Sequence, residues 1–332
     1  MKLITYRSER GDRLAAQLNA THAVDLLDAA QRRGKATLDS FASMLALIRG
    51  GDAALVDARA LAAAADADAR DILTMRGLHL LAPLPLPEQI RDFANYELHV
   101  RQALQSSMRL RSMNELDPVA ALAKHQASGM FSIPPVWYER PLYYKCNRFS
   151  VVGPGADIEW PNFSQRMDYE MELAVIIGKQ VKNLTVEEAM DAVFGYTIYN
   201  DFSARDAQAQ ETSFRMGPAK GKDFDTGNAM GPCIVTRDEI ADPYALAMRV
   251  SVNGKPRSET VSGGMQHDIA RCISFLSQSE TLYPGEVLAM GTVGNGCGYE
   301  SLTFLDDGDV VDIEVEGIGL LRNQLVKHKE LT

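Results

Sequence analysis

The stretch over residues 167–178 constrains the fold more than any other part of the chain. Side chains on a β-strand alternate between two faces, so Glu170 and Glu172 point the same way. Residues 173–177 are apolar on both faces, which predicts a strand buried on both sides. Two carboxylates side by side in a buried strand either share a proton or bind a cation. The pair is therefore the first candidate for a site.

A second acidic row, near the C-terminus, shows how little an alternating pair proves by itself. Asp312, Glu314 and Glu316 alternate with apolar residues over 311–316. This complete alternation is typical of a strand with one face in solvent, so we interpret the row as solvated. The pair at 170 and 172 differs because an apolar run directly follows it. Other parts of the chain must supply further support for a site.

Composition indicates a soluble globular protein with a substantial core. The chain has 332 residues, of which 46% are hydrophobic and 23% charged. No apolar run approaches the roughly 20 residues of a membrane helix, so we expect no membrane partner. Residues 1–7 reach a charge too soon for a signal peptide, which favours a cytoplasmic protein. The net charge of −10, without a basic cluster, argues against nucleic acid as a partner.

The cysteines give no indication of a zinc site. They are widely spaced, form no C-x-x-C motif and have no histidine near them in the sequence. We therefore expect reduced cysteines that serve as packing residues. They are Cys146, Cys233, Cys272 and Cys297.

The domain organisation is indicated by a proline-rich stretch. Three alternating prolines in residues 81–87 predict a stiff connector. Residues 1–80 mix short strands with helices and predict a small α+β accessory domain. We expect residues 81–89 to be the linker and residues 90–332 to be a second, larger domain. Because strands dominate after the boundary, the predicted fold class is α+β, mainly β.

Two further segments place carboxylates beside predicted elements. Residues 88–109 predict a helix on which Asp92 and His99, seven residues apart, share one face. Residues 193–201 predict a second apolar strand, and it ends on the carboxylate of Asp201.

Four motifs follow one another along the chain in a specific order. They are Asp92 with His99 seven residues later, the D-Y-E-M-E-L strand, the N-D-F-S-A-R-D-A-Q segment, and G-K-D-F-D-T followed by P-G-E-V-L-A-M-G-T. In this order they resemble the fumarylacetoacetate hydrolase family, and bacterial two-domain members in particular, over residues 88–326. The resemblance implies a catalytic domain folded as a mixed β-sandwich roll, a small α+β N-terminal domain before it, and a homodimer.

The resemblance also implies a complete site. A divalent cation would be held by the carboxylates of Asp92, Glu170, Glu172 and Asp201. His99 is similar to the catalytic histidine of the family and Glu300 to the carboxylate that orients it, with Lys222 as a third catalytic residue. The implied substrate-binding residues are Gln208, Tyr143, Tyr144 and Thr292. The residues around the two tyrosines depart from the P-V-G-Y-H-G-R pattern of fumarylacetoacetase, which leaves the exact substrate open.

An all-oxygen ligand set determines which cation we expect. Carboxylates without cysteine or histidine suit a hard cation, so we expect Mg²⁺, with Mn²⁺ or Ca²⁺ as alternatives, and not zinc. Coordination positions left open by the protein would fit the two oxygens of a 1,3-dicarbonyl or a 2-oxo acid. A small molecule of this kind is therefore the expected substrate.

The predicted function is hydrolytic cleavage of a carbon–carbon bond in an acylpyruvate or β-diketo acid of aromatic or amino-acid catabolism. His99, oriented by Glu300, would deprotonate the attacking water, while Lys222 and Gln208 stabilise the developing negative charge. Because an enolate held by a metal serves other reactions too, an isomerase, decarboxylase or dehydratase of a 2-oxo acid is the alternative. A non-catalytic metal-binding protein is the third interpretation.

Each of these residues also has a purely structural interpretation. His99 fits a packing or surface histidine, and Asp92 fits a charge on a helix face. Lys222 fits a salt-bridge partner in a loop, and Gln208 a solvated residue after a helix start. If the residues form a site, Asp92 must lie near the glutamate pair and the imidazole must face the same space.

Overall fold

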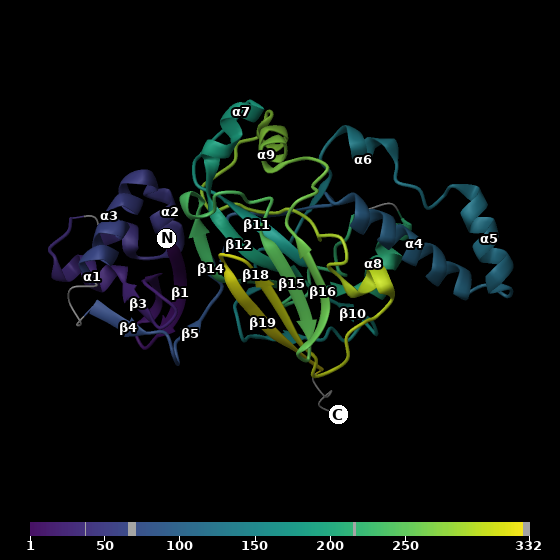
Figure 1. The fold of residues 1–332 in the computed structure, drawn as a ribbon, viewed down its shortest axis with the longest axis horizontal. Helices are drawn as coiled ribbons and strands as arrows, with labels where there is room; N and C mark the ends of the chain where they lie inside the picture. The colour runs from purple at the N-terminus through teal and green to yellow at the C-terminus, as the bar shows by residue number, and fades with distance from the viewer. Residues whose placement is uncertain (37, 66–70, 215–216, 328–332) are drawn as a thin grey trace.

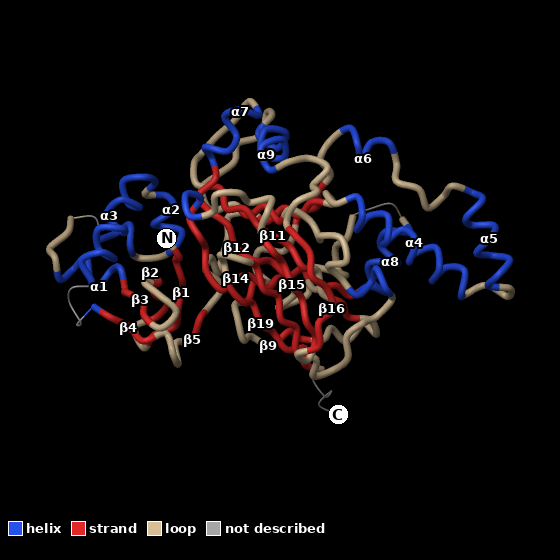
Figure 2. The backbone as a smooth tube through the Cα atoms, in the orientation of Figure 1, coloured by secondary structure: helices blue, strands red, loops and turns tan. Residues whose placement is uncertain are grey.

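The computed structural model describes residues 1–36, 38–65, 71–214 and 217–327. Within these ranges the strands form one 12-stranded sheet, one 5-stranded sheet and one 2-stranded sheet. Figures 1 and 2 show β11, β12, β14 and β15 in the centre, α1, α2 and α3 with β1, β3, β4 and β5 on one side of the molecule, and α4, α5 and α6 on the other. No helix in the described ranges is long and apolar enough to cross a membrane.

The large sheet combines the N-terminal strands with strands from residues 90–289. Its order is β4 (Ile72–Thr74), β3 (His22–Asp25), β2 (Gly11–Gln17), β1 (Lys2–Ser8), β14 (Asn228–Thr236), β12 (Val193–Asp201), β11 (Met171–Ile177), β17 (Val287–Ala289), β6 (Ile90–Phe93) and β7 (Tyr143–Lys145). Two short strands join it at the side, β5 (His79–Leu80) on β1 and β8 (Val151–Val152) on β14. Most neighbours are antiparallel, but β6 runs parallel to β17, so the sheet is mixed.

The second sheet packs against the middle of the first. It consists of β16 (Lys255–Val261), β15 (Ala247–Val252), β18 (Val310–Val315), β19 (Gly319–Val326) and β9 (Asp157–Glu159). Val250 and Ile313 from this sheet share one core cluster with Leu173 and Ile198 from the large sheet. The small sheet pairs β10 (Met167–Asp168) with β13 (Ser203–Ala204). The predicted fold class, α+β and mainly β with a mixed sandwich, is confirmed.

Strand β11 is the central strand that its sequence predicts. All seven of its residues are buried, and so are all nine residues of the adjacent β12. Leu173 and Val175 belong to the core between the two sheets, whereas Ala174 and Ile176 belong to a second core on the opposite face. Because alternate side chains enter different cores, the strand needs apolar residues on both faces.

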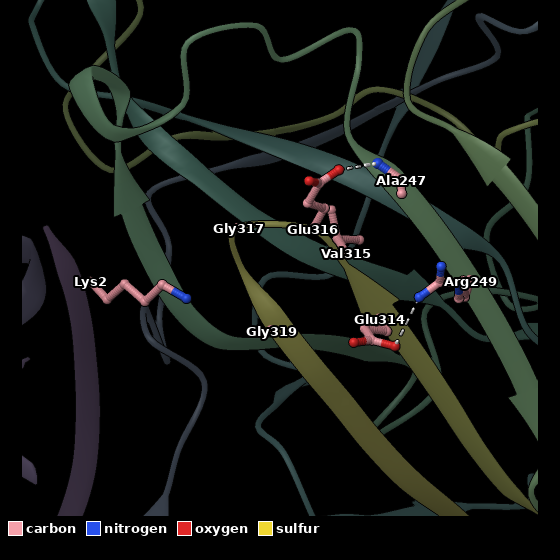
Figure 3. Close-up of a pocket in the computed structure, with 8 residues that line it drawn as sticks. All are labelled: Lys2, Ala247, Arg249, Glu314, Val315, Glu316, Gly317 and Gly319. Carbon is pink, nitrogen blue, oxygen red and sulfur yellow. Dashed lines mark hydrogen bonds and ion pairs between the residues drawn. The ribbon is translucent and has the colours of Figure 1, made fainter. Parts of the chain in front are cut away.

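The acidic row on β18 also has the predicted environment. Val311, Ile313 and Val315 are buried, while Glu314 and Glu316 are exposed. Figure 3 shows both glutamates around an open hollow, where Glu316 accepts a hydrogen bond from the backbone of residue 247 and Glu314 pairs with a neighbouring arginine. The interpretation as a solvated row is confirmed for Glu314 and Glu316, whereas Asp312 is half-buried and binds Arg322.

The helices are distributed along the chain between the strands. They are α1 (Leu26–Arg32), η1 (Leu38–Phe41), α2 (Met44–Arg49), α3 (Gly51–Ala65), α4 (Glu97–Met113), α5 (Pro118–Ser128), α6 (Pro135–Glu139), α7 (Val186–Ala189), η3 (Met190–Ala192), α8 (Arg205–Ser213), η4 (Arg237–Glu239), α9 (Ile269–Ser277) and η5 (Gly298–Ser301). Strand β1 pairs with β14 through Leu3 and Ile234, so the strands of residues 1–80 continue the large sheet.

The helix predicted over residues 88–109 is wrong in its first part. Ile90–Phe93 form β6, and α4 begins only at Glu97. All four residues of β6 are buried between β17 and β7, whose backbones satisfy its hydrogen-bonding groups on both sides. Sheet pairing therefore overrides the local periodicity. As a consequence, Asp92 lies on a strand and His99 on the following helix.

Candidate active site

Four carboxylates converge where the central strands of the large sheet lie side by side. Asp92 lies on β6, Glu172 on β11, Asp201 at the end of β12, and Glu170 immediately before β11. None of the four is more than 5% exposed. Oxygen atoms of Asp92, Glu170 and Glu172 lie within 4.8 Å of one another. The hydroxyl of Tyr144 joins the fourth carboxylate to the group, because its oxygen lies within hydrogen-bond distance of both Asp92 and Asp201. We call these four residues the carboxylate cluster.

Two buried cations neutralise only part of this charge. The Nζ of Lys222 lies 2.6 Å from Glu170 Oε2 and 2.6 Å from Asp201 Oδ2. The guanidinium of Arg205 lies 2.7 Å from Glu170 and also binds Asp168. Five carboxylates thus meet two side-chain cations. The excess of negative charge is the electrostatic condition for binding a further cation.

The pKa values show which carboxylates of the cluster resist ionisation. Burial, followed by the charges of Glu172 and Asp201, raises the pKa of Asp92 well above its usual value. Burial and the charge of Glu170 do the same to the pKa of Glu172. Burial acts in the same direction on Glu170, but Arg205 and Lys222 outweigh it and lower its pKa to about 2. A metal cation near Asp92 and Glu172 would displace their protons.

The donor atoms fit a hard divalent cation. The Oδ1 atom of Asp201 is buried and has no hydrogen-bond partner among the described residues. An unpartnered buried carboxylate oxygen is costly unless something binds it. The cluster offers oxygen ligands alone, which is the set that Mg²⁺ and Mn²⁺ prefer. The residues of the cluster therefore fit such an ion.

The position of Glu172 is fixed by the segment that follows β17. Its Oε2 accepts a hydrogen bond of 3.0 Å from the N–H of Gly291, and its Oε1 one of 3.1 Å from the hydroxyl of Thr292. Gly291 has a φ of +93°, and a Cβ there would overlap the carbonyl oxygen of Phe93. Only glycine lets the backbone approach Glu172 in this way.

An imidazole and a carboxylate form a pair beside the cluster. His99 Nδ1 on α4 lies 2.9 Å from Glu300 Oε1 on η5, close enough to donate a hydrogen bond. The other oxygen of Glu300 accepts from the N–H of Cys297 at 3.2 Å. A β-bridge between Glu170 and Cys297 places this loop next to the cluster. Because Glu300 occupies Nδ1, the Nε2 atom is the one left to meet a reactant.

A cavity of about 650 Å³ lies between α4 and α8. His99, Glu170, Arg205 and Gln208 line it at the cluster, and it extends along α4 as far as Arg111. At 1.5 Å per residue, the helix spans roughly 18 Å between His99 and Arg111. The space beside the imidazole is therefore long enough for a molecule larger than a four-carbon acid.

Three of the four predicted substrate-binding residues lie at the site, and one does not. Tyr144 contacts the cluster, and Thr292 contacts Glu172. Gln208 lines the cavity, where its Oε1 accepts a hydrogen bond of 3.0 Å from Arg205. Tyr143 precedes Tyr144 on β7 and points to the opposite face, where its ring lies 5.5 Å from that of Phe93. Tyr143 therefore does not join the others.

Two residues of this site were not predicted from the sequence. Arg205 is buried, binds Glu170 and Asp168, and lies 5.0 Å from the ring centroid of Tyr299. Asp168 also accepts hydrogen bonds from the N–H groups of Gly298 and Tyr299. Asp168 lies two residues before Glu170, so the same alternation that groups the glutamates could have identified it.

Comparison with known sequences identifies the class of protein. Residues 89–326 match the sequence model described as Fumarylacetoacetate (FAA) hydrolase C-terminal. This match covers more than half of the chain and includes every residue of the carboxylate cluster. The chain belongs to the fumarylacetoacetate hydrolase family.

Two curated relatives are similar to part of the chain. The mitochondrial oxaloacetate tautomerase of Xenopus laevis is 39% identical over 189 residues, which are 57% of this chain and 59% of the relative. The oxaloacetate tautomerase YisK of Bacillus subtilis is 38% identical over 189 residues, 56% of this chain and 62% of the relative. The matched stretch thus covers less than two thirds of either relative.

Solved structures are similar over nearly the whole chain. A fumarylacetoacetate hydrolase from Exiguobacterium antarcticum has a TM-score of 0.72 and 28% identity, covering 99% of this chain and 100% of that one. A maleylpyruvate hydrolase from Sphingobium sp. SYK-6, in complex with manganese(II) and pyruvate, has a TM-score of 0.68 and 23% identity, with the same coverage. The second likeness concerns the fold alone.

Proposed function

We propose that this protein is a metal-dependent enzyme that interconverts the keto and enol forms of a 2-oxo acid through an enolate. The observation that carries the proposal is the carboxylate cluster beside the His99–Glu300 pair, with Glu170 of the cluster and His99 of the pair both lining the cavity. Two relatives named as oxaloacetate tautomerases support this reaction class. An enolate needs stabilisation of its oxygen and a group that moves a proton at carbon, and these side chains can supply both.

We assign the cation to the carboxylate cluster, with Mg²⁺ as the physiological ion and Mn²⁺ or Ca²⁺ as substitutes. When bound there, it would supply Lewis-acid stabilisation to the oxygen on which the charge of the enolate develops. The unpartnered oxygen of Asp201 and the raised pKa values of Asp92 and Glu172 support this assignment.

The chain's own residues have separate roles in this proposal. His99 removes a proton from the substrate carbon and returns it, using Nε2. Glu300 is a positioning residue, because it holds Nδ1 and so fixes the ring and its tautomer. Lys222, which contacts Asp201, and Gln208, which lines the cavity, would add positive charge and a hydrogen-bond donor near the developing oxyanion.

The reaction can be tested directly with oxaloacetate. We expect the Mg²⁺-loaded protein to accelerate conversion of its enol form into the keto form, followed by ultraviolet absorbance. A chelator should abolish this acceleration, and added Mg²⁺ should restore it. If the Mg²⁺-loaded protein changes neither oxaloacetate nor any member of a panel of acylpyruvates, the proposal is contradicted.

Hydrolytic carbon–carbon cleavage of an acylpyruvate is the second candidate. The size of the cavity favours it, since roughly 18 Å along α4 exceeds what a four-carbon acid needs. In that reaction His99 would deprotonate a water instead of a carbon. Reaction in ¹⁸O-labelled water separates the candidates, because hydrolysis places solvent oxygen in the carboxylate of the released acid and isomerisation leaves the carbon skeleton intact.

Thr292 provides a test of how the cation is positioned. We expect Thr292→Val to weaken Mn²⁺ binding by about 2- to 10-fold, because one hydrogen bond to Glu172 is worth about 0.5–1.5 kcal/mol. Calorimetric titration with Mn²⁺ measures the effect. The matched control is Thr197→Val, since the Thr197 hydroxyl is also buried but has no partner among the described residues. Equal affinities in both variants would show that Thr292 does not support the cation.

A further inference from the structure

One buried thiol lies beside the catalytic pair and has no role in the proposed reaction. The Sγ of Cys297 is 3.9 Å from His99 Nδ1, and Glu300 Oε1 is 2.9 Å from the same nitrogen. The donor atoms of the three residues all lie within 4.8 Å of one another. An imidazole nitrogen, a thiol sulfur and a carboxylate oxygen thus face one small volume.

We propose that His99, Cys297 and Glu300 form a second metal site, selective for Zn²⁺ or a similar thiophilic ion, and that its occupation inhibits the enzyme. The site differs from the carboxylate cluster in its ligands. Sulfur and imidazole nitrogen favour Zn²⁺, whereas carboxylates alone favour Mg²⁺ and Mn²⁺. The two sites therefore distinguish the two kinds of cation by chemistry.

The distances are close to those of a tetrahedral zinc site. Bonds of about 2.0 Å to nitrogen and oxygen and about 2.3 Å to sulfur give about 3.5 Å between N and S and about 3.3 Å between N and O. The observed separations are 3.9 Å and 2.9 Å. Shifts of a few tenths of an ångström would convert the existing arrangement into ligation. Three protein ligands leave a fourth position for water.

The cation has a route to the site. His99 lines the cavity, and its side chain is 14% exposed, whereas that of Glu300 is 3% exposed. Burial raises the pKa of the Cys297 thiol, so a proton must leave when the metal binds. The charges of Asp168, Glu300 and Glu170 also raise this pKa, whereas the charge of Arg205 and the N–H that Glu300 donates to Cys297 Sγ favour the thiolate.

Binding of a metal ion at this second site would prevent His99 and Glu300 from acting in proton transfer. Nδ1 would bind the cation instead of donating to Glu300. The ring would then lose the carboxylate that stabilises the imidazolium formed when Nε2 accepts a proton. Inhibition would therefore arise without displacement of Mg²⁺ from the carboxylate cluster. Excess Mg²⁺ should consequently fail to relieve it.

A cobalt titration tests the site without any assay of activity. Co²⁺ added to the Mg²⁺-saturated protein should produce the near-ultraviolet charge-transfer band of a cobalt–thiolate bond, at one equivalent. Cys297→Ser and Cys297→Ala should both abolish the band. Cys233→Ser is the control, because Cys233 is also buried but contacts the carbonyl of Ile318. Absence of the band in the natural protein would overturn the proposal, whatever reaction the enzyme catalyses.

A zinc titration then tests the inhibition. Each variant is compared with its own activity in the absence of zinc. We expect Zn²⁺ to inhibit the natural protein and Cys233→Ser alike, and both Cys297 variants to need at least about tenfold more Zn²⁺. Equal sensitivity in the Cys297 variants, or relief of inhibition by excess Mg²⁺, would assign the zinc to the carboxylate cluster and overturn the proposal.

Discussion

Replacement of His99 by alanine should lower turnover of the 2-oxo acid by about 10²- to 10⁴-fold, the usual contribution of a general acid or base. Binding of Mn²⁺ should remain within a few-fold of the natural protein, because the imidazole is outside the carboxylate cluster. Steady-state kinetics at saturating Mg²⁺ measures the first quantity, and calorimetry with Mn²⁺ measures the second.

The control for this variant is His79→Ala. His79 lies on β5, is exposed and is distant in the fold from the cavity, so its loss should leave turnover unchanged. If His99→Ala keeps full turnover, His99 is a packing residue and the proposed proton transfer is wrong. If it loses Mn²⁺ binding as well as turnover, the imidazole serves the cation and not the substrate.

Replacement of Glu172 by glutamine should abolish the stabilisation of the protein by Mg²⁺. A cation at 100 times its dissociation constant contributes about 2.7 kcal/mol to folding, and this increment should disappear. The same change should raise the melting temperature of the metal-free protein at neutral pH. The reason is that burial and the charge of Glu170 disfavour an ionised Glu172, so a neutral amide fits the metal-free site better.

The stability of the metal-free protein should depend on pH through Glu172. The folded-state pKa of Glu172 is raised, so the folded protein binds a proton that the unfolded chain releases earlier. The stabilisation that this proton gives to the folded protein is therefore fully present below the usual carboxyl pKa. It is lost as the pH rises through the higher pKa that Glu172 has in the folded protein. Metal-free natural protein should lose melting temperature over this range more steeply than Glu172→Gln.

The acidic row on β18 supplies the matched control. Glu314 also alternates with apolar residues, but it is exposed and pairs with Arg249 at 3.9 Å. Glu314→Gln should change neither the melting temperature nor its response to Mg²⁺, since such surface pairs contribute about 0–1 kcal/mol. If Mg²⁺ still raises the melting temperature of Glu172→Gln, Glu172 is not a ligand of the cation.

The sequence predicts the central part of the fold because the signal there is local. A strand with two buried faces must be apolar at every position, and residues 173–177 meet that condition, so β11 and the glutamate pair beside it could be located. The solvated alternation on β18 could be identified for the same reason. Both predictions need only the side chains of one strand.

The remaining features depend on partners that are far apart in the chain. Asp92 looks helical by spacing, but β17, nearly 200 residues later, pairs with its segment and makes it a strand. The choice between Tyr143 and Tyr144 depends on which of them faces Asp92 across the β6–β7 pairing. Cys297 and His99 are separated by 198 residues, so no spacing rule for metal ligands could have placed them together.

The cluster and the imidazole are carried by different kinds of element. The strands that hold Asp92, Glu172 and Asp201 are fixed by hydrogen bonds to both neighbours, whereas His99 belongs to a helix outside the sheet. Insertions or replacements in α4 and the segment after it should therefore change the length of the cavity and its choice of substrate while the carboxylate cluster keeps its geometry. An engineer who wants a new substrate should vary the outer helical wall and leave the strands unchanged.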